Sequence, residues 1–260
     1  MISFKQDTSL VDVEDAYIKH KESPGVPIRI PGMLRHGGGF GIPFALIQFF
    51  AAWSRATQNS LLKLYASDVP EANLEAFAQE PQGMAALYFA SNVEYSDSGQ
   101  EPSKVGLAHA IGRIEAMQSG KYRQTMHGRG AFLACFSGAR NEFLLPLYSK
   151  GQNGSLRGRE EFSHLTERII ESCAPSALRS ISDGQFQAIS NLIYELFRNT
   201  DEHAQNDENG NRYHRNIRGL MAKFISKSRS TIAADTQGQD VPQNIFMLRT
   251  LSNICRSRQF

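Results

Sequence analysis

The sequence predicts an α/β fold in two domains, with an α+β arrangement as the alternative. Strands and a helix alternate between residues 26 and 66, and a polar, glycine-rich stretch at 149–160 precedes a long amphipathic helix near 183–204. A chain of 260 residues is long enough for two modest domains, each with its own core. We therefore expect an N-terminal α/β domain, residues 1–150, with a regulatory or interaction role, and a second domain, residues 151–260.

A βαβ unit is expected near the start of the first domain. Val26 to Ile30 is typical of a short strand, Pro43 starts an apolar helical pattern that continues through Ala56, and Leu61 to Ala66 predicts a second strand. Two such strands joined through a helix connect right-handed, which predicts a parallel sheet. The segment HGGGFG at 36–41 can cradle a phosphate before the helix, but it lacks the Lys-Ser ending of a P-loop and favours a tight turn.

The remaining elements are predicted from shorter patterns. The start of the chain is polar, and the composition of residues 91–103 is that of an exposed loop. We expect helices at 73–79, 84–90, 105–117, 161–172, 216–226 and 242–255, and strands at 131–136 and 142–148.

The composition excludes several classes of protein. Hydrophobic residues make up 41% of the chain and charged residues 21%, as in ordinary globular proteins and unlike disordered ones. A net charge of +2 is too small for the whole molecule to attract a polyanion. Cys135, Cys173 and Cys255 are an odd number without CxxC spacing, so neither a disulfide framework nor a zinc site is expected. We place Cys135 and Trp53 in the core.

No membrane segment is expected. The amino terminus carries acids where a signal peptide has a basic region and an apolar run. The most apolar stretch, Ile42 to Trp53, is about a dozen residues long, whereas about 20 are needed to span a bilayer. We therefore expect a cytoplasmic protein.

The helix near 183–204 has the clearest functional pattern. Ser182 or Asp183 can cap it, and Glu195, Asn199 and His203 lie four residues apart, which places them in one row along one face. A carboxylate in such a row can deprotonate a water, and an amide oxygen suits Mg²⁺, which keeps waters and substrate phosphates in its shell. These groups suit phosphoryl transfer. The apolar stripe beside the row is predicted to consist of Phe186, Ile189, Ile193, Leu196 and Phe197.

The segment NLIYELFRNTDEHA at 191–204 resembles the N-box of the GHKL ATPases, which include gyrase-type ATPases, histidine kinases and mismatch-repair ATPases. The shared pattern is roughly E-L-x-x-N-A-x-x-H-A, and Thr200 departs from its usual alanine. The resemblance implies Mg²⁺ and ATP as cofactors, Glu195 as general base and Asn199 as magnesium ligand. It places His203 either beside the phosphates or in the packing of the helix. It also implies that residues 151–260 form the first part of a Bergerat-type α/β sandwich.

A wider resemblance extends to bacterial GHKL proteins in which an α/β domain, vaguely like the STAS fold, precedes the ATPase domain. RGL at 218–220 contributes to it. The next family motif, D-x-G-x-G, is not found: DENGN at 207–211 follows the N-box too closely, and TQGQD at 237–241 has the wrong order. We expect the chain to end before that motif. The alternative function is a non-enzymatic protein-interaction module, with a degenerate or truncated nucleotide site and a partner bound through the N-terminal domain.

A basic segment follows the N-box. It offers phosphates an attractive surface, but only Tyr213 and Phe224 could stack on bases, so nucleic acid is not expected as a partner. Its basic residues are Arg212, His214, Arg215, Arg218, Lys223, Lys227 and Arg229.

Overall fold

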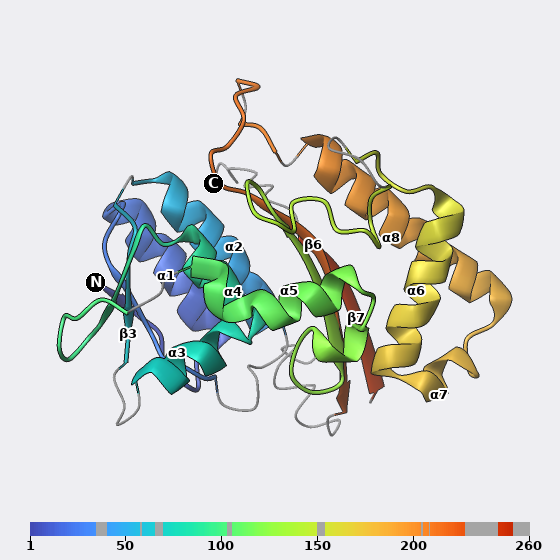
Figure 1. The fold of residues 1–260 in the computed structure, drawn as a ribbon, viewed down its shortest axis with the longest axis horizontal. Helices are drawn as coiled ribbons and strands as arrows, with labels where there is room; N and C mark the ends of the chain where they lie inside the picture. The colour runs from blue at the N-terminus through green and yellow to red at the C-terminus, as the bar shows by residue number, and fades with distance from the viewer. Residues whose placement is uncertain are drawn as a thin grey trace. The chain divides into compact units, whose positions relative to one another are not determined.

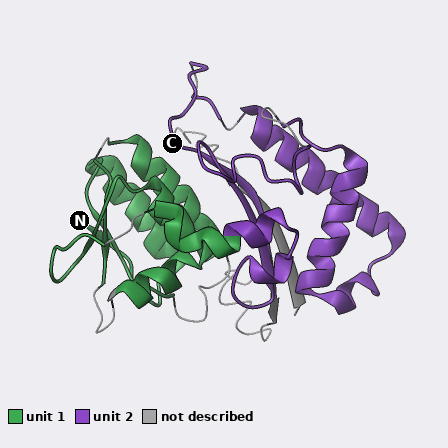
Figure 2. Ribbon diagram, viewed as in Figure 1, with its two compact units in different colours: residues 1–113, 255–260 green, residues 114–254 purple. Residues whose placement is uncertain are grey.

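The chain folds into two compact units, unit 1 (Met1–Arg113) and unit 2 (Ile114–Ile254) (Figure 2). The predicted boundary near residue 150 therefore falls inside unit 2. The reason is long-range pairing, because a strand that begins at Gly130 joins the sheet of the C-terminal half. The computed structural model describes residues 1–34, 41–57, 59–65, 70–102, 106–149, 154–203, 205–207, 209–226 and 244–251.

Unit 1 is built on a parallel sheet with the strand order β1-β2-β3-β4. Successive strands are neighbours, so right-handed crossovers place their helices on one face, and α1, α2 and α4 lie together on one side of the sheet (Figure 1). The strands are β1 (Ile2–Ser3), β2 (Ile28–Ile30), β3 (Leu61–Leu64) and β4 (Asn92–Tyr95). The helices are α1 (Leu10–Glu22), α2 (Ile42–Arg55), α3 (Pro70–Ala78), α4 (Pro81–Phe89), η2 (Gly106–Ala110) and α5 (Ile111–Gln118), the last of which crosses the unit boundary.

The core of unit 1 lies between the sheet and α2. Alternate strand residues such as Ile28, Ile30 and Leu62 are fully buried, as expected for a sheet with one helix-covered face. Trp53 on α2 is also fully buried, and its indole Nε1–H donates to the Val26 carbonyl at 3.0 Å. The expected core position of Trp53 and the parallel βαβ unit are confirmed.

Three elements of unit 1 were not predicted, and the first is β1, which pairs with β2 in parallel. The polar start contains α1, which a capping box begins: the Asp12 amide donates to Ser9 Oγ at 3.2 Å, and the Ser9 amide donates to Asp12 Oδ2 at 2.7 Å. The expected loop at 91–103 contains β4, because Val93 and its neighbours pair with β3. Most of the HGGGFG turn lies outside the described residues.

Unit 2 is an antiparallel sheet with the strand order β5-β6-β7, and α6 and α8 pack on one of its faces (Figure 1). The molecule is therefore mixed α/β, as expected. The elements are η3 (Tyr122–Gln124), β5 (Gly130–Phe136), α6 (Arg159–Cys173), α7 (Pro175–Leu178), α8 (Asp183–His203), β6 (Ile217–Ser226) and β7 (Asn244–Leu251).

Three predicted elements of unit 2 are wrong. The helices expected at 216–226 and 242–255 are β6 and β7, because each pairs along its length with a neighbouring strand and that pairing outweighs local helical spacing. The strand expected at 142–148 is a succession of turns, in which the amides of Leu147 and Tyr148 both donate to the Leu144 carbonyl at 2.9 Å. No helix in the described part of the chain is long and apolar enough to cross a membrane.

Substitution of Gly83 on α4 tests the packing of unit 1. A Cβ added there would lie 1.8 Å from the Phe77 carbonyl oxygen, whereas a Cβ added at Gly112 on α5 meets nothing within 4 Å. We expect Gly83→Ala to lower the free energy of unfolding by about 3 kcal/mol or more through overpacking. Gly112→Ala should leave stability unchanged or raise it by up to about 1 kcal/mol, because alanine favours helix. Urea unfolding of the full chain measures both, and equal effects would contradict this packing.

Candidate functional site

The site helix α8 runs without a break from Asp183 to His203. A capping box precedes it, as predicted for Ser182: the Gln185 amide donates to Ser182 Oγ at 3.4 Å, and the Ser182 amide donates to Gln185 Oε1 at 3.0 Å. The helix is therefore continuous between the Glu195 carboxylate and the Asn199 amide, which keeps their spacing of one turn.

One face of α8 packs into unit 2. Ile193 and Phe197 are buried as predicted, whereas Leu196 is 43% exposed and does not belong to the core stripe. The Phe197 ring lies 5.7 Å from that of Phe162 on α6, centroid to centroid. Thr200, which replaces the usual alanine of the resemblance, is buried and donates its hydroxyl to the Leu196 carbonyl at 2.8 Å, so the departure is accommodated.

A buried ion pair fixes the end of α8 to the sheet. Arg218 on β6 is only 1% exposed, and its Nη1 donates to Asp201 Oδ1 at 2.5 Å. Tyr148 donates its hydroxyl to the same oxygen at 2.6 Å, and Arg218 Nη2 donates to the Glu142 carbonyl at 2.9 Å. The pair therefore connects a strand, a loop and the site helix.

The pKa values of Arg218, Tyr148 and Cys135 are shifted by burial and by these contacts. Burial lowers the pKa of Arg218, but Tyr148, Cys135 and Asp201 outweigh it, so the pKa of Arg218 is raised overall and the guanidinium stays charged. Burial, together with the charges of Cys135 and Asp201, raises the pKa of Tyr148, so its hydroxyl stays a donor. Burial also raises the pKa of Cys135 to about 11, which confirms it as an unreactive core thiol.

The Glu195 carboxylate forms ion pairs with two arginines. Arg159, the first residue of α6, donates to its Oε1, and Arg198 Nη2 lies 2.8 Å from its Oε2. Arg159 Nη1 also donates to Asn191 Oδ1 at 3.3 Å. The carboxylate is 32% exposed and has a guanidinium group at each oxygen, so it is not a free base in this conformation.

Asn199 and His203 lie on the same side of α8 and are exposed. The His203 side chain is 70% exposed, and its Nε2 lies 3.7 Å from Glu202 Oε2. The three residues therefore form the predicted row, but they do not converge on one point of an enclosed cavity. Among the residues that the structure describes, no group of three His, Cys, Asp or Glu side chains could hold a metal ion.

Comparison with known protein families, with curated proteins and with solved structures gives no match.

Within its described residues, 209–226, the basic segment has two arginines that are ion-paired with carboxylates. Arg218 is buried in its ion pair with Asp201, and Arg212 Nη2 lies 2.7 Å from Glu142 Oε1. Lys227 and Arg229 lie outside the described residues. Two of the expected basic side chains are therefore ion-paired with carboxylates of unit 2.

Sequence reasoning missed Asp201, Arg218 and Tyr148 as the residues that position α8. The available signal was an arginine inside the apolar run IRGLMA, since a charge in a buried strand needs a partner. Its partner could not be found from spacing, because Arg218 and Asp201 come from different elements and meet only in the fold.

We expect the two halves of this buried pair to respond differently to substitution. Asp201→Ala leaves the Arg218 charge buried without its partner and should lower the free energy of unfolding by about 3 to 5 kcal/mol. Arg218→Met should cost less, because Asp201 is 22% exposed and can be hydrated. Arg212→Ala, which breaks an exposed pair with Glu142, serves as the control and should cost about 1 kcal/mol or less. Urea unfolding measures all three, and similar costs throughout would contradict the buried pair.

Proposed function

We propose that unit 2 binds Mg-ATP along the Glu195, Asn199 and His203 row of α8, and that hydrolysis requires Glu195 to leave its arginines. The observation that carries this proposal is the uninterrupted helix, which keeps all three side chains on one side while the Asp201–Arg218 pair fixes the opposite side of the same end to the sheet. The packing of α6 and α8 on an antiparallel sheet agrees with the sandwich that the family resemblance implies.

The chemistry of the row supports nucleotide binding. The Asn199 side chain is exposed and makes no hydrogen bond within the described part of the chain, so its oxygen is available to Mg²⁺. One amide oxygen is enough for such a site, because Mg²⁺ takes most of its remaining ligands from waters and nucleotide phosphates.

Arg159 and Arg198 add the positive charge that a triphosphate needs. Their guanidinium groups hold the Glu195 carboxylate, and arginine binds phosphate oxygens with the same paired geometry. An arriving triphosphate competes for these groups and releases Glu195. The freed carboxylate accepts the proton of a water whose oxygen forms a bond to the γ-phosphorus, and the bond to ADP breaks.

A second candidate is a protein-interaction module with a degenerate nucleotide site. It is favoured by the same two ion pairs, because a guanidinium group at each oxygen keeps the Glu195 carboxylate from contacting an attacking water. In this case α8 presents a stable outer surface, and Mg-ATP has no measurable effect on the protein. Binding and hydrolysis measurements separate the two functions.

Calorimetry with Mg-ATP on the full chain tests nucleotide binding. We expect saturable heat that depends on Mg²⁺, and an affinity at least tenfold lower in Asn199→Ala, because the metal loses its protein ligand. Gln187→Ala is a matched control, since it removes an exposed amide about 18 Å away along the same helix. The absence of heat from the unaltered chain, or equal affinity in the two variants, would favour the interaction module.

Measuring phosphate release from Mg-ATP tests the role of Glu195 as general base. We expect Glu195→Ala to abolish any turnover with Mg-ATP binding retained, because the variant keeps Asn199 and loses only the proton acceptor. Glu202→Ala removes a more exposed carboxylate two turns further along α8 and should leave turnover unchanged. Hydrolysis that persists in Glu195→Ala would refute the role of Glu195.

A further inference from the structure

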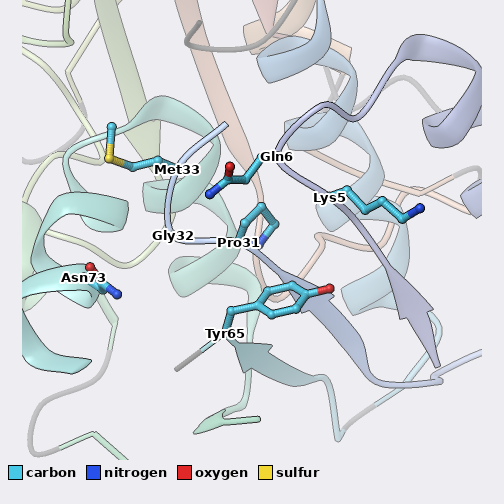
Figure 3. A pocket seen from close by; sticks show the side chains of 7 residues that line it. All are labelled: Lys5, Gln6, Pro31, Gly32, Met33, Tyr65 and Asn73. Carbon is cyan, nitrogen blue, oxygen red and sulfur yellow. The ribbon is translucent and has the colours of Figure 1, made fainter. Parts of the chain in front are cut away.

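A second candidate site lies in unit 1, far in sequence from α8. It is a pocket of about 480 Å³ at the carboxyl ends of three neighbouring parallel strands (Figure 3). Its volume is within the range of pockets that hold small molecules. The lining residues are Lys5 and Gln6 after β1, Pro31, Gly32 and Met33 after β2, Tyr65 after β3, and Asn73 on α3.

We propose that this pocket binds a small planar organic anion, an aromatic carboxylate or phosphate. The first argument is its place in the fold. In open α/β sheets, ligands bind outside the carboxyl ends of the parallel strands, where the chain leaves each strand for the next helix. Residues that directly follow β1, β2 and β3 all contribute to the pocket.

The second argument is the chemistry of the lining. Lys5 is the one charged residue among these seven described residues, so the described part of the lining has a positive balance. The amide of Gln6 offers both donors and an acceptor to a ligand. Figure 3 shows the Gln6 amide extending over Pro31 and Gly32, on the side of the pocket opposite the Tyr65 ring.

Tyr65 and its neighbours favour a planar ligand. The Arg29 guanidinium lies over the Tyr65 ring, 3.9 Å from its centroid, and Arg29 Nη2 is 3.7 Å from Asp97 Oδ1. These contacts hold the aromatic ring in place at the pocket wall. A held ring beside Pro31 suits a flat apolar body (Figure 3), and the exposed Lys5 in the lining supplies a positive charge for its negative group.

Gly32 gives a steric test of the site. A Cβ added there would lie 3.6 Å from the Asn73 carbonyl oxygen and 3.7 Å from Asn73 Cβ, which are ordinary contact distances. Gly32→Ala therefore fits without displacement. The longer side chain of Gly32→Leu does not fit within that contact, so it has to displace Asn73 or turn into the pocket, and either change alters the volume that a ligand needs.

Ligand-observed NMR by saturation transfer on the full chain tests the proposal with four probes. We expect transfer to phenyl phosphate, to benzoate or to both, and little to benzyl alcohol or benzylamine, which match them in shape without the negative charge. Whichever of the two anions receives the stronger saturation transfer shows whether the pocket prefers a phosphate or a carboxylate. If neither anion binds, or if the neutral and cationic probes bind equally well, the proposal is wrong.

Variants locate the binding. Lys5→Gln should lower the affinity for the anion at least tenfold. Lys19→Gln makes the same change at an exposed position on α1 and should leave the affinity unchanged. Gly32→Leu should abolish binding and Gly32→Ala should retain it, with thermal unfolding as the check on folding. Binding that is unaffected by both Lys5→Gln and Gly32→Leu would overturn the assignment. Asn199→Ala should leave this binding intact, so the two sites can fail separately.

Discussion

The architecture of unit 2 depends on one buried charge. Arg218 is enclosed on β6, and a guanidinium in such a place costs several kcal/mol unless it is paired and hydrogen-bonded. Asp201, Tyr148 and the Glu142 carbonyl supply those partners from the site helix and from the turns after β5. The interaction therefore fixes both the position and the rotation of α8 relative to the sheet.

That rotation decides which side chains of α8 are available for function. With Ile193, Phe197 and Thr200 facing the interior, Glu195 and Asn199 must lie on the outer side. The same packing brings the start of α6 close enough for Arg159 to hold Glu195. Core packing and the ion pairing of the Glu195 carboxylate are thus consequences of a single placement of the helix.

The arrangement of unit 1 depends on the order and direction of its strands. Its four strands are parallel and in sequence order, so every strand ends at the same edge of the sheet and every crossover leaves from that edge. Backbone groups and side chains from three separate segments consequently gather there, around one pocket. The two candidate sites arise in different ways: the row on α8 comes from helical periodicity, and the pocket comes from the topology of a parallel sheet.

The sequence by itself determined the elements whose information is local. Helical spacing and a capping residue, Ser182 or Asp183, predicted α8, and the strand, helix and strand pattern predicted β2, α2 and β3; the burial of Trp53 was also predicted. Only the tertiary structure decided that 217–226 and 244–251 are strands, that Arg218 pairs with Asp201, and that Lys5 and Tyr65 line one pocket. The physical reason is distance along the chain: periodicity reports which face of a segment is apolar, whereas strand pairing, ion pairs and pockets depend on which segments meet.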